Sequence, residues 1–472
     1  MSLRPHCFAV LLILVLLSGL WTRTRVQPLD AYDQPFYLGI AFDLVHHHRF
    51  TDGYRFDGGD ATRLRPAGMR FTPLYPELLA AIATVDPGLR GDMDCLVAHG
   101  GHGASCSRDA GPVRPLQFLM LAATMWMLWW CGWRCSERMC TGWIALVLAL
   151  ATAPLLLLSV DYLMTEIVSL FLCVLAQTLA LRALPADDRS WDPHPLWLFG
   201  SGLALGAAVL ARPGFSLLAA ALIGLGAIWI ASGPRRGPAL KAVAGFAGGV
   251  ALAVLPWILR NAVVMGKPAL TFGYASHTLV QRLSFNTMSW HEYAMSFVCW
   301  LPDGNGLGAA LAGPHACDRF GWDDHPNSFY ALGIGPMLVR TLQEAGGWSR
   351  HMSFLLRTYL LHDPVRQLGW HVLVTVPLAL RGLYVDHWWG FVLGPVCAVL
   401  TIRAATRRTA TDRRYLLLAL PGWFMLTVNA AVAVNQVRYN LMLIVPLSVA
   451  GALVVERLAG PAPAFLARFR RG

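Results

Sequence analysis

The sequence predicts an α-helical, polytopic membrane protein of about ten transmembrane helices, and three observations support this class. Hydrophobic residues make up 56% of the 472 residues and charged residues only 14%, whereas soluble domains carry roughly 25% charged residues. The mean hydropathy is +0.49. Long apolar runs recur along the chain, which excludes the two or three soluble domains that roughly this length would otherwise suggest.

Ten apolar runs are predicted to cross the membrane, although several are shorter than the roughly 20 residues that a perpendicular helix needs. These runs are 8–21, 115–133, 140–158, 163–183, 196–211, 214–231, 242–259, 387–402, 415–434 and 440–456. No A-x-A cleavage site follows Trp21, so the first run is interpreted as a membrane anchor and not as a signal peptide.

Basic residues orient these helices. With the amino terminus inside, the short inner loops contain Arg134, Arg138, Arg182, Arg189, Arg235, Arg236, Lys241, Arg403, Arg407, Arg408, Arg413, Arg414, Arg457, Arg468, Arg470 and Arg471. Lys and Arg concentrate in cytoplasmic loops of membrane proteins, so this pattern sets the orientation. The net charge of +11 is therefore attributed to topology and contact with membrane lipids, and no nucleic-acid partner is expected.

Two long segments, 22–114 and 260–386, are then expected on the outer side, together with most of the chemically versatile residues. Four of the ten cysteines lie in them as two locally spaced pairs, Cys95 with Cys106 and Cys299 with Cys317. This spacing fits two disulfides in an oxidising compartment. The apolar stretch 371–385 is predicted to lie in the membrane interface, flanked by Trp370, Trp388 and Trp389.

The segment Leu29–Phe50 follows the first span and contains the first candidate for catalysis. Asp33, Tyr37, Ala41 and Leu44 are spaced i, i+4, i+8 and i+11, so a helix would place them on one face. That face would hold a carboxylate at the boundary between water and lipid, where it could act on a substrate that a lipid delivers. In a second interpretation, Asp30 is the N-cap and Asp33 the N3 residue of a capping-box-like helix start.

Six segments then occur in an order that resembles one enzyme superfamily. They are the pattern of Asp33, Gln34, Tyr37, Leu38, Ala41 and Leu44, then TPLYPELLAAI (72–82), LSVDYLMTEIVSLFL (158–172), AVLARPGFSLL (208–218), LPWILRNAVVMGKPAL (255–270) and VRYNLMLIVPL (437–447). Together they resemble the GT-C glycosyltransferases that use polyprenyl-phosphate sugars, including the bacterial protein-mannosyltransferase-like and aminoarabinose-transferase-like families. Three positions depart from the pattern, namely Gln34 for an acid, Thr72 for a proline and Ile167 for a proline.

The resemblance implies that the protein transfers a sugar from a polyprenyl-phosphate donor to a glycan, lipid or protein acceptor. It would work on the periplasmic side of a bacterial inner membrane. The expected modules are 1–270, a catalytic membrane module with the first outer loop 22–114; 271–386, an outer segment on the acceptor side; and 387–472, the last membrane helices with a basic cytoplasmic tail. The donor itself is the only ligand implied, and a divalent metal is not required.

Site residues follow from the chemistry of such a transfer. The acceptor loses a proton as it attacks the anomeric carbon, and Asp33 is the predicted general base. Arg212, Arg260 and Arg438 stand where spans meet the outer side and are predicted to bind the donor phosphate. Alternatively, these arginines snorkel to the interface. Tyr37 and Tyr439 are placed beside the donor by the same motifs.

Two further acids, Asp161 and Glu166, lie between the third and fourth spans. Either could cap the fourth helix, whereas the resemblance gives Glu166 a supporting role opposite Asp33 and Asp161 a weaker one. A metal site at His46, His47 and His48 is not expected, because consecutive helical residues point about 100° apart.

Two rival functions remain. A transporter or flippase of a lipid-linked saccharide would show paired repeats and charges at the membrane midplane. A membrane scaffold would leave the ordered acidic and arginine motifs unexplained.

Overall fold

The structure is a computed structural model that describes residues 3–24, 27–53, 63–102, 106, 110–185, 193–232, 236–321, 325–384, 387–407 and 409–459. Throughout these ranges the regular elements are helices, and no strand occurs within them. The predicted all-helical class is therefore confirmed.

Each of the ten predicted spans corresponds to a helix or to a pair of helices. They are α1 (Arg4–Trp21), α5 (Val113–Ser136), α6 (Met139–Leu150) with α7 (Ala153–Asp161), α8 (Thr165–Ala183), α9 (Pro195–Ala211), α10 (Phe215–Ser232), α11 (Arg236–Met265), α19 (His387–Arg407), α20 (Ala410–Val432) and η4 (Val437–Leu443) with α21 (Ile444–Leu458). Among the described residues, 8 helices are long and apolar enough to cross a membrane, or 9 if the bent pair α6–α7 is one span. The remaining predicted span, 196–211, corresponds to α9, an apolar helix of 17 residues.

The third predicted span, 140–158, corresponds to two helices that meet at a bend. Helix α6 ends at Leu150 and α7 begins at Ala153, with an angle of 59° between them. Pro154 lies in the first turn of α7. Because proline lacks the N–H that would bond to the carbonyl of Leu150, the helical ladder is interrupted at this point.

Helices α9 and α11 pack through their backbones. A Cβ atom on Gly202 would lie 1.9 Å from the carbonyl oxygen of Phe246, and one on Gly249 would lie 2.1 Å from that of Phe199. Small residues allow the two backbones to approach this closely. Because no hydrophobic force drives helices together in lipid, close van der Waals contact stabilises the pair instead. The packing fixes the outer end of α9, where Arg212 follows the last helical residue.

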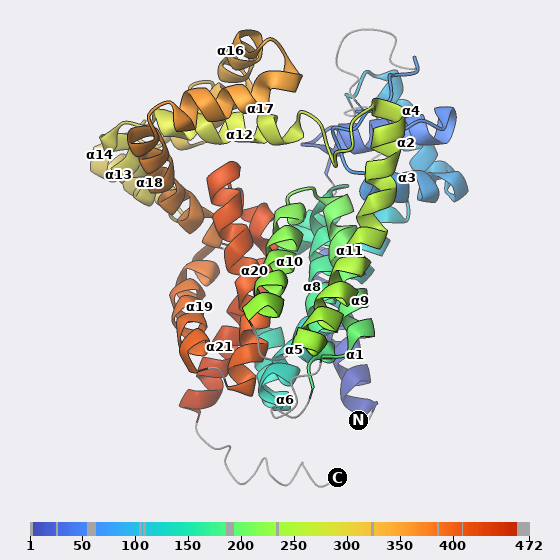
Figure 1. The fold of residues 1–472 in the computed structure, drawn as a ribbon, viewed down its shortest axis with the longest axis vertical. Coiled ribbons are helices and arrows are strands. Elements are labelled where there is room, and N and C mark those ends of the chain that lie inside the picture. Colours follow the sequence, from blue (N-terminus) through green and yellow to red (C-terminus); the bar gives the residue numbers. More distant parts are fainter. Residues whose placement is uncertain are drawn as a thin grey trace.

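Both long segments between spans lie at one end of the helical bundle, and α6 and the carboxyl-terminal end of α21 lie at the other (Figure 1). The first segment contains α2 (Gln34–His47), α3 (Leu74–Val85) and α4 (Pro87–Ala98). The second contains α12 (Tyr274–Ser284), η1 (Phe285–Thr287), α13 (Trp290–Cys299), α14 (Gly304–Ala312), η2 (Asp318–Phe320), α15 (Phe329–Ile334), α16 (Pro336–Ala345), α17 (Trp348–Leu356), η3 (Arg357–Leu361) and α18 (Pro364–Leu383).

Residues 371–383 of the predicted interfacial stretch 371–385 belong to a longer helix, α18, which begins at Pro364 and is capped by the Asp363 side chain, and residue 385 lies outside the described residues. Val365, Val372 and Val376 are exposed along α18, whereas Val374 and Leu378 are buried in a cluster with residues of α20 and the outer helices. An apolar exposed face beside a buried face fits a helix that lies against lipid and protein at once.

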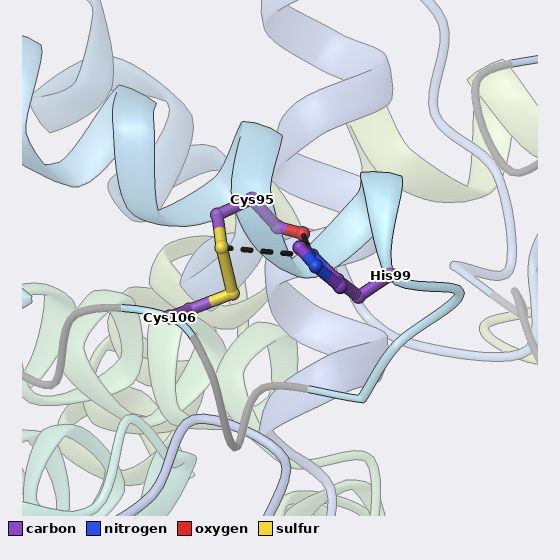
Figure 2. Close-up of side chains that lie close together, drawn as sticks. All are labelled: Cys95, His99 and Cys106. Atoms are coloured by element: carbon purple, nitrogen blue, oxygen red, sulfur yellow. Dashed lines mark hydrogen bonds between the residues drawn. A yellow bond between two sulfur atoms is a disulfide. The ribbon is translucent and has the colours of Figure 1, made fainter.

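Two disulfides join the predicted cysteine pairs, Cys95 with Cys106 and Cys299 with Cys317. In Figure 2 the Cys95–Cys106 bond lies beside His99, whose Nδ1–H donates to the carbonyl oxygen of Cys95 at 2.8 Å. The side-chain ligand atoms of these three residues lie within 4.8 Å of one another. Because the sulfur atoms are bonded to each other, neither thiolate is available to a metal.

The orientation of the bundle is open to a direct test. A reporter fused after Arg236, at the start of α11, should be cytoplasmic, because basic loops remain on that side. A reporter inserted at Asn305, on α14, should be outside. If protease protection placed both reporters on the same side, the predicted topology and the outer location of Asp33 would be wrong.

Candidate active site

A pocket opens at the end of the membrane helices where the two long segments lie, and it gathers residues from distant parts of the chain. It is lined by Asp33, Tyr37, Arg70, Phe71, Thr72, Thr165, Glu166, Ala211, Arg212, Pro213, Tyr274 and Tyr439. Its empty volume is about 400 Å³, including the part that is open to solvent. Five of the eight residues predicted from sequence line this pocket.

Asp33 occupies the N-cap position of α2, yet its side chain makes no capping hydrogen bond. The helix begins at Gln34, so the interpretation of Asp30 as the N-cap and Asp33 as N3 is wrong. Asp33 has right-handed helical backbone angles (φ −86°, ψ 0°), which keep it on the face of Tyr37, four residues later. Both side chains consequently line the pocket.

Gln34, where the family pattern has an acid, ties the start of α2 to the turn before α8. Its Nε2 donates to the carbonyl oxygens of Pro28 and Ala31, both at 2.9 Å. Its Oε1 accepts a hydrogen bond of 2.8 Å from the backbone N–H of Leu163. An ionised carboxylate only accepts hydrogen bonds, so it cannot replace this amide. Gln34 therefore positions the turns on both sides of the pocket.

Glu166 is the second residue of α8, and its side chain is 3% exposed. Its Oε1 lies 3.4 Å from Nη1 of Arg212 and 3.7 Å from Nη1 of Arg438. Its Oε2 is buried and accepts no hydrogen bond from the described residues. A buried carboxylate is tolerated when cations surround it, so Glu166 and the two arginines form one electrostatic unit.

Arg212 and Arg438 share an aromatic neighbour as well as a carboxylate. The guanidinium of Arg212 lies over the ring of Tyr439 at 4.5 Å, and that of Arg438 lies 5.6 Å from the same ring. On its other side Arg438 faces the ring of Tyr32 at 5.0 Å.

The guanidinium groups of Arg212 and Arg438 each carry five N–H donors, and Glu166 approaches only one terminal nitrogen of each. Nε of Arg438 also donates to Oε1 of Gln436, and its Nη1 to the sulfur of Met164. The described contacts therefore leave Nη2 of Arg438 and most donors of Arg212 for an anionic ligand.

The environment of Asp33 favours a proton acceptor with a raised pKa. Burial raises the pKa of the Asp33 carboxyl above its ordinary value, the positive charge of Arg438 opposes this shift, and the negative charge of Glu166 adds to it. Burial also raises the pKa of Tyr37 well above its ordinary value, and the charge of Asp33 adds to the shift. Tyr37 therefore remains a neutral neighbour of the carboxyl in the pocket lining.

Sequence reasoning missed the outer wall of the pocket, which Arg70 and Tyr274 form. Nη2 of Arg70 donates to Nδ1 of His277 at 2.7 Å, and the Arg70 guanidinium lies over the Trp348 ring at 5.4 Å. Burial, Arg70 and His351 together lower the pKa of His277 to about 4, so this histidine is a neutral acceptor. The position of Arg70, two residues before the motif that begins at Thr72, was an available signal.

Three predicted residues are absent from the pocket lining. Arg438 lies beside it, 3.7 Å from Glu166, whereas Arg260 and Asp161 make other contacts. Arg260 donates to the carbonyl oxygens of Gly68 (2.7 Å) and Phe50 (3.2 Å), so it fastens the first outer loop to α11. Asp161 is the last residue of α7, not a turn residue, and its Oδ1 accepts a 3.0 Å hydrogen bond from the Trp21 indole. Both contacts hold the scaffold together and leave these side chains away from the lining.

No family model and no curated protein matches the chain. Solved structures that are similar to it include two of the oligosaccharyltransferase of Archaeoglobus fulgidus. One is tethered to an acceptor peptide, with 13% identity and a TM-score of 0.48, and covers 95% of this chain and 49% of the other. The second, in complex with an inhibitory peptide and a dolichol-phosphate, has 14% identity and a TM-score of 0.49, with 96% and 51% covered. This chain thus spans about half the length of those proteins, and similarity at this level assigns no function.

Proposed function

We propose that this protein is an integral membrane glycosyltransferase that takes a sugar from a polyprenyl-phosphate donor on the outer side of the membrane. One observation carries the proposal. The Asp33 carboxyl, whose pKa is raised, shares a pocket with Arg212. The guanidinium groups of Arg212 and Arg438 both lie beside the buried carboxylate of Glu166. In a glycosyl transfer, the base can accept the proton of the acceptor. The pair of cations can stabilise the negative charge of the phosphate leaving group.

In this reaction the acceptor hydroxyl or amine attacks the anomeric carbon of the sugar. The bond between that carbon and the phosphate oxygen breaks, and its electron pair leaves with the polyprenyl phosphate. Asp33 takes the proton of the attacking group. Arg212 and Arg438 stabilise the negative charge that develops on the phosphate, because the guanidinium fork matches phosphate oxygens. In this mechanism they provide the positive charge that a divalent metal would otherwise provide.

Glu166 has a positioning role in this proposal. It holds two guanidinium groups, which would otherwise repel each other, at one edge of the pocket. Tyr439 packs under Arg212 and restricts its orientation. The lipid tail of the donor remains in the bilayer, because the pocket lies where α8 begins and α9 ends.

The outer segment 271–386 is proposed to receive the acceptor. It contributes Tyr274 to the pocket and contacts Arg70 through His277 and Trp348. The rival function, transport of a lipid-linked saccharide, favours charges at the membrane midplane. Here the charged residues gather at the outer ends of the helices, which favours the enzyme.

The test is to incubate the purified protein with a series of polyprenyl-phosphate sugars and candidate acceptors, and to identify products by mass spectrometry. We expect consumption of one donor, release of free polyprenyl phosphate and a matching mass gain on the acceptor. If no donor is bound or consumed, the proposed function is wrong. Movement of an intact donor across a proteoliposome membrane without loss of its sugar would support the transporter instead.

A further inference from the structure

Arg438 and Tyr439 belong to a short irregular segment between two membrane helices. Helix α20 ends at Val432, and α21 begins at Ile444. The intervening η4 is a 3₁₀ segment in which Asn440 has non-helical angles (φ −113°, ψ 18°). A segment without a regular α-helical hydrogen-bond ladder needs other contacts to fix its conformation.

Three asparagine side chains provide these contacts. Nδ2 of Asn440 donates to Oδ1 of Asn435 at 2.7 Å and to the carbonyl oxygen of Gln436 at 3.2 Å. Nδ2 of Asn429, on α20, donates to Oδ1 of Asn440 and to the carbonyl oxygen of Tyr439, both at 3.2 Å. Asn435 and Asn440 are 0% exposed. A buried network whose members are satisfied rigidifies the backbone around it.

Asn435 also connects this network to the outer segment. Its backbone is left-handed (φ 46°), a conformation that asparagine adopts more readily than most other residues. Its Nδ2 donates to the carbonyl oxygen of Leu378 on α18 at 2.6 Å. The side of α18 that faces these amides carries Gly382, where a Cβ atom would lie 2.3 Å from Nδ2 of Asn435 and 2.6 Å from Nδ2 of Asn440. Any larger residue would displace both amides.

We propose that Asn435 and Asn440 are positioning residues that hold Arg438 and Tyr439 against Glu166 and Arg212, and that α18 sets this position through Gly382. This inference rests on the proposed donor site. It assigns a function to the glycine and to the left-handed asparagine, neither of which lines the pocket. It also links the outer segment 271–386 mechanically to the donor phosphate, because α18 is the last helix of that segment.

Two variants test the proposal by different routes. Asn440→Leu removes the amide while keeping a similar shape, and Gly382→Ala adds one methyl group without deleting any polar group. Both should weaken binding of a polyprenyl phosphate in detergent micelles by about tenfold, which corresponds to the loss of one good contact. If Asn440→Leu does not fold, Gly382→Ala still tests the same network.

The matched control is Gln177→Leu. Gln177 on α8 is a buried amide that donates to the carbonyl oxygen of Leu418 on α20 at 3.1 Å, away from the pocket lining. Its loss should lower the melting temperature as the loss of Asn440 does, but leave the donor affinity unchanged. If all three variants lower the melting temperature and none weakens the donor affinity, the asparagine network is only structural and the proposal is wrong.

A second readout does not depend on the identity of the donor. Fluorotyrosine at position 439 should give one ¹⁹F resonance in the otherwise unchanged protein and in Gln177→Leu, and a shifted or split resonance in Asn440→Leu and Gly382→Ala. An unchanged resonance in both of these variants overturns the positioning proposal, whatever the donor affinity. Failure of the unsubstituted protein to bind polyprenyl phosphate, with the resonance shifted as expected, would instead reject the proposed function alone.

Discussion

Asp33→Asn should abolish sugar transfer while leaving the folded protein intact. Asparagine keeps the size of the side chain but cannot accept the proton of the acceptor, so transfer should fall by about 10²–10⁴-fold. The side chain makes no capping hydrogen bond, so the melting temperature should stay near that of the unsubstituted protein. The measurement is product formation by mass spectrometry, paired with thermal unfolding in the same detergent.

The matched control is Asp94→Asn, which changes an exposed acid of the same outer segment that pairs with His46. It should retain activity. Transfer by Asp33→Asn within a fewfold of the unsubstituted protein would rule out Asp33 as the general base. A loss of about 0.5–2 kcal/mol of stability would instead indicate a capping role.

The pH profile offers an independent check on the same residue. Because a general base acts when deprotonated, kcat/KM should rise with pH through the pKa of Asp33 and then level off. That pKa is raised by burial, so the acidic limb should lie above the ordinary aspartate value of 3.8. Arg438 is the largest opposing influence on this pKa, so Arg438→Gln should move the limb to still higher pH.

Arg212→Ala should give the second large effect. It removes one of the two cations beside Glu166 and the donors that Arg212 offers to the pocket. Loss of one preorganised donor to a developing negative charge reduces turnover by about 10²–10³-fold. Arg212→Lys should lose less, because lysine keeps the charge but not the bidentate fork.

The outcome separates phosphate binding from snorkelling. Arg182→Ala is the matched control, since Arg182 is an exposed arginine at the opposite end of α8 that lies over the Trp197 ring. Its loss should leave donor binding and transfer unchanged. If Arg212→Lys and Arg212→Ala behave like Arg182→Ala, the side chain only reaches the interface, and the proposed donor site is wrong.

The placement of residues that lie close together in the sequence was predicted well. Asp33 and Tyr37 are four residues apart, so one helix suffices to place them on the same face. Each cysteine pair is separated by 18 residues or fewer, so local folding brings its members together. Arg212 directly follows the last residue of an apolar run. Its position in the sequence therefore predicts that it lies at the edge of the membrane.

Depth along a membrane helix does not fix the direction in which a side chain points. Arg260 and Arg212 occupy similar depths in the predicted topology, yet Arg260 turns toward the backbone of the first outer loop and Arg212 toward Glu166. Asp161 is likewise near the outer edge but faces Trp21. Helix rotation depends on packing against neighbouring helices, and the pattern of a single apolar run does not specify it.

The sequence by itself determined the membrane class, the helices to which the predicted spans correspond, both disulfide pairs and the acid at the start of α2. All of these depend on hydropathy, charge or short spacings, which are properties of one segment at a time. Only the tertiary structure decided that Arg70 and Tyr274 meet Asp33 in one pocket, and that Gly382 and three asparagines hold the segment carrying Arg438. Those residues come from different helices and loops, and they meet because several helices pack together at once.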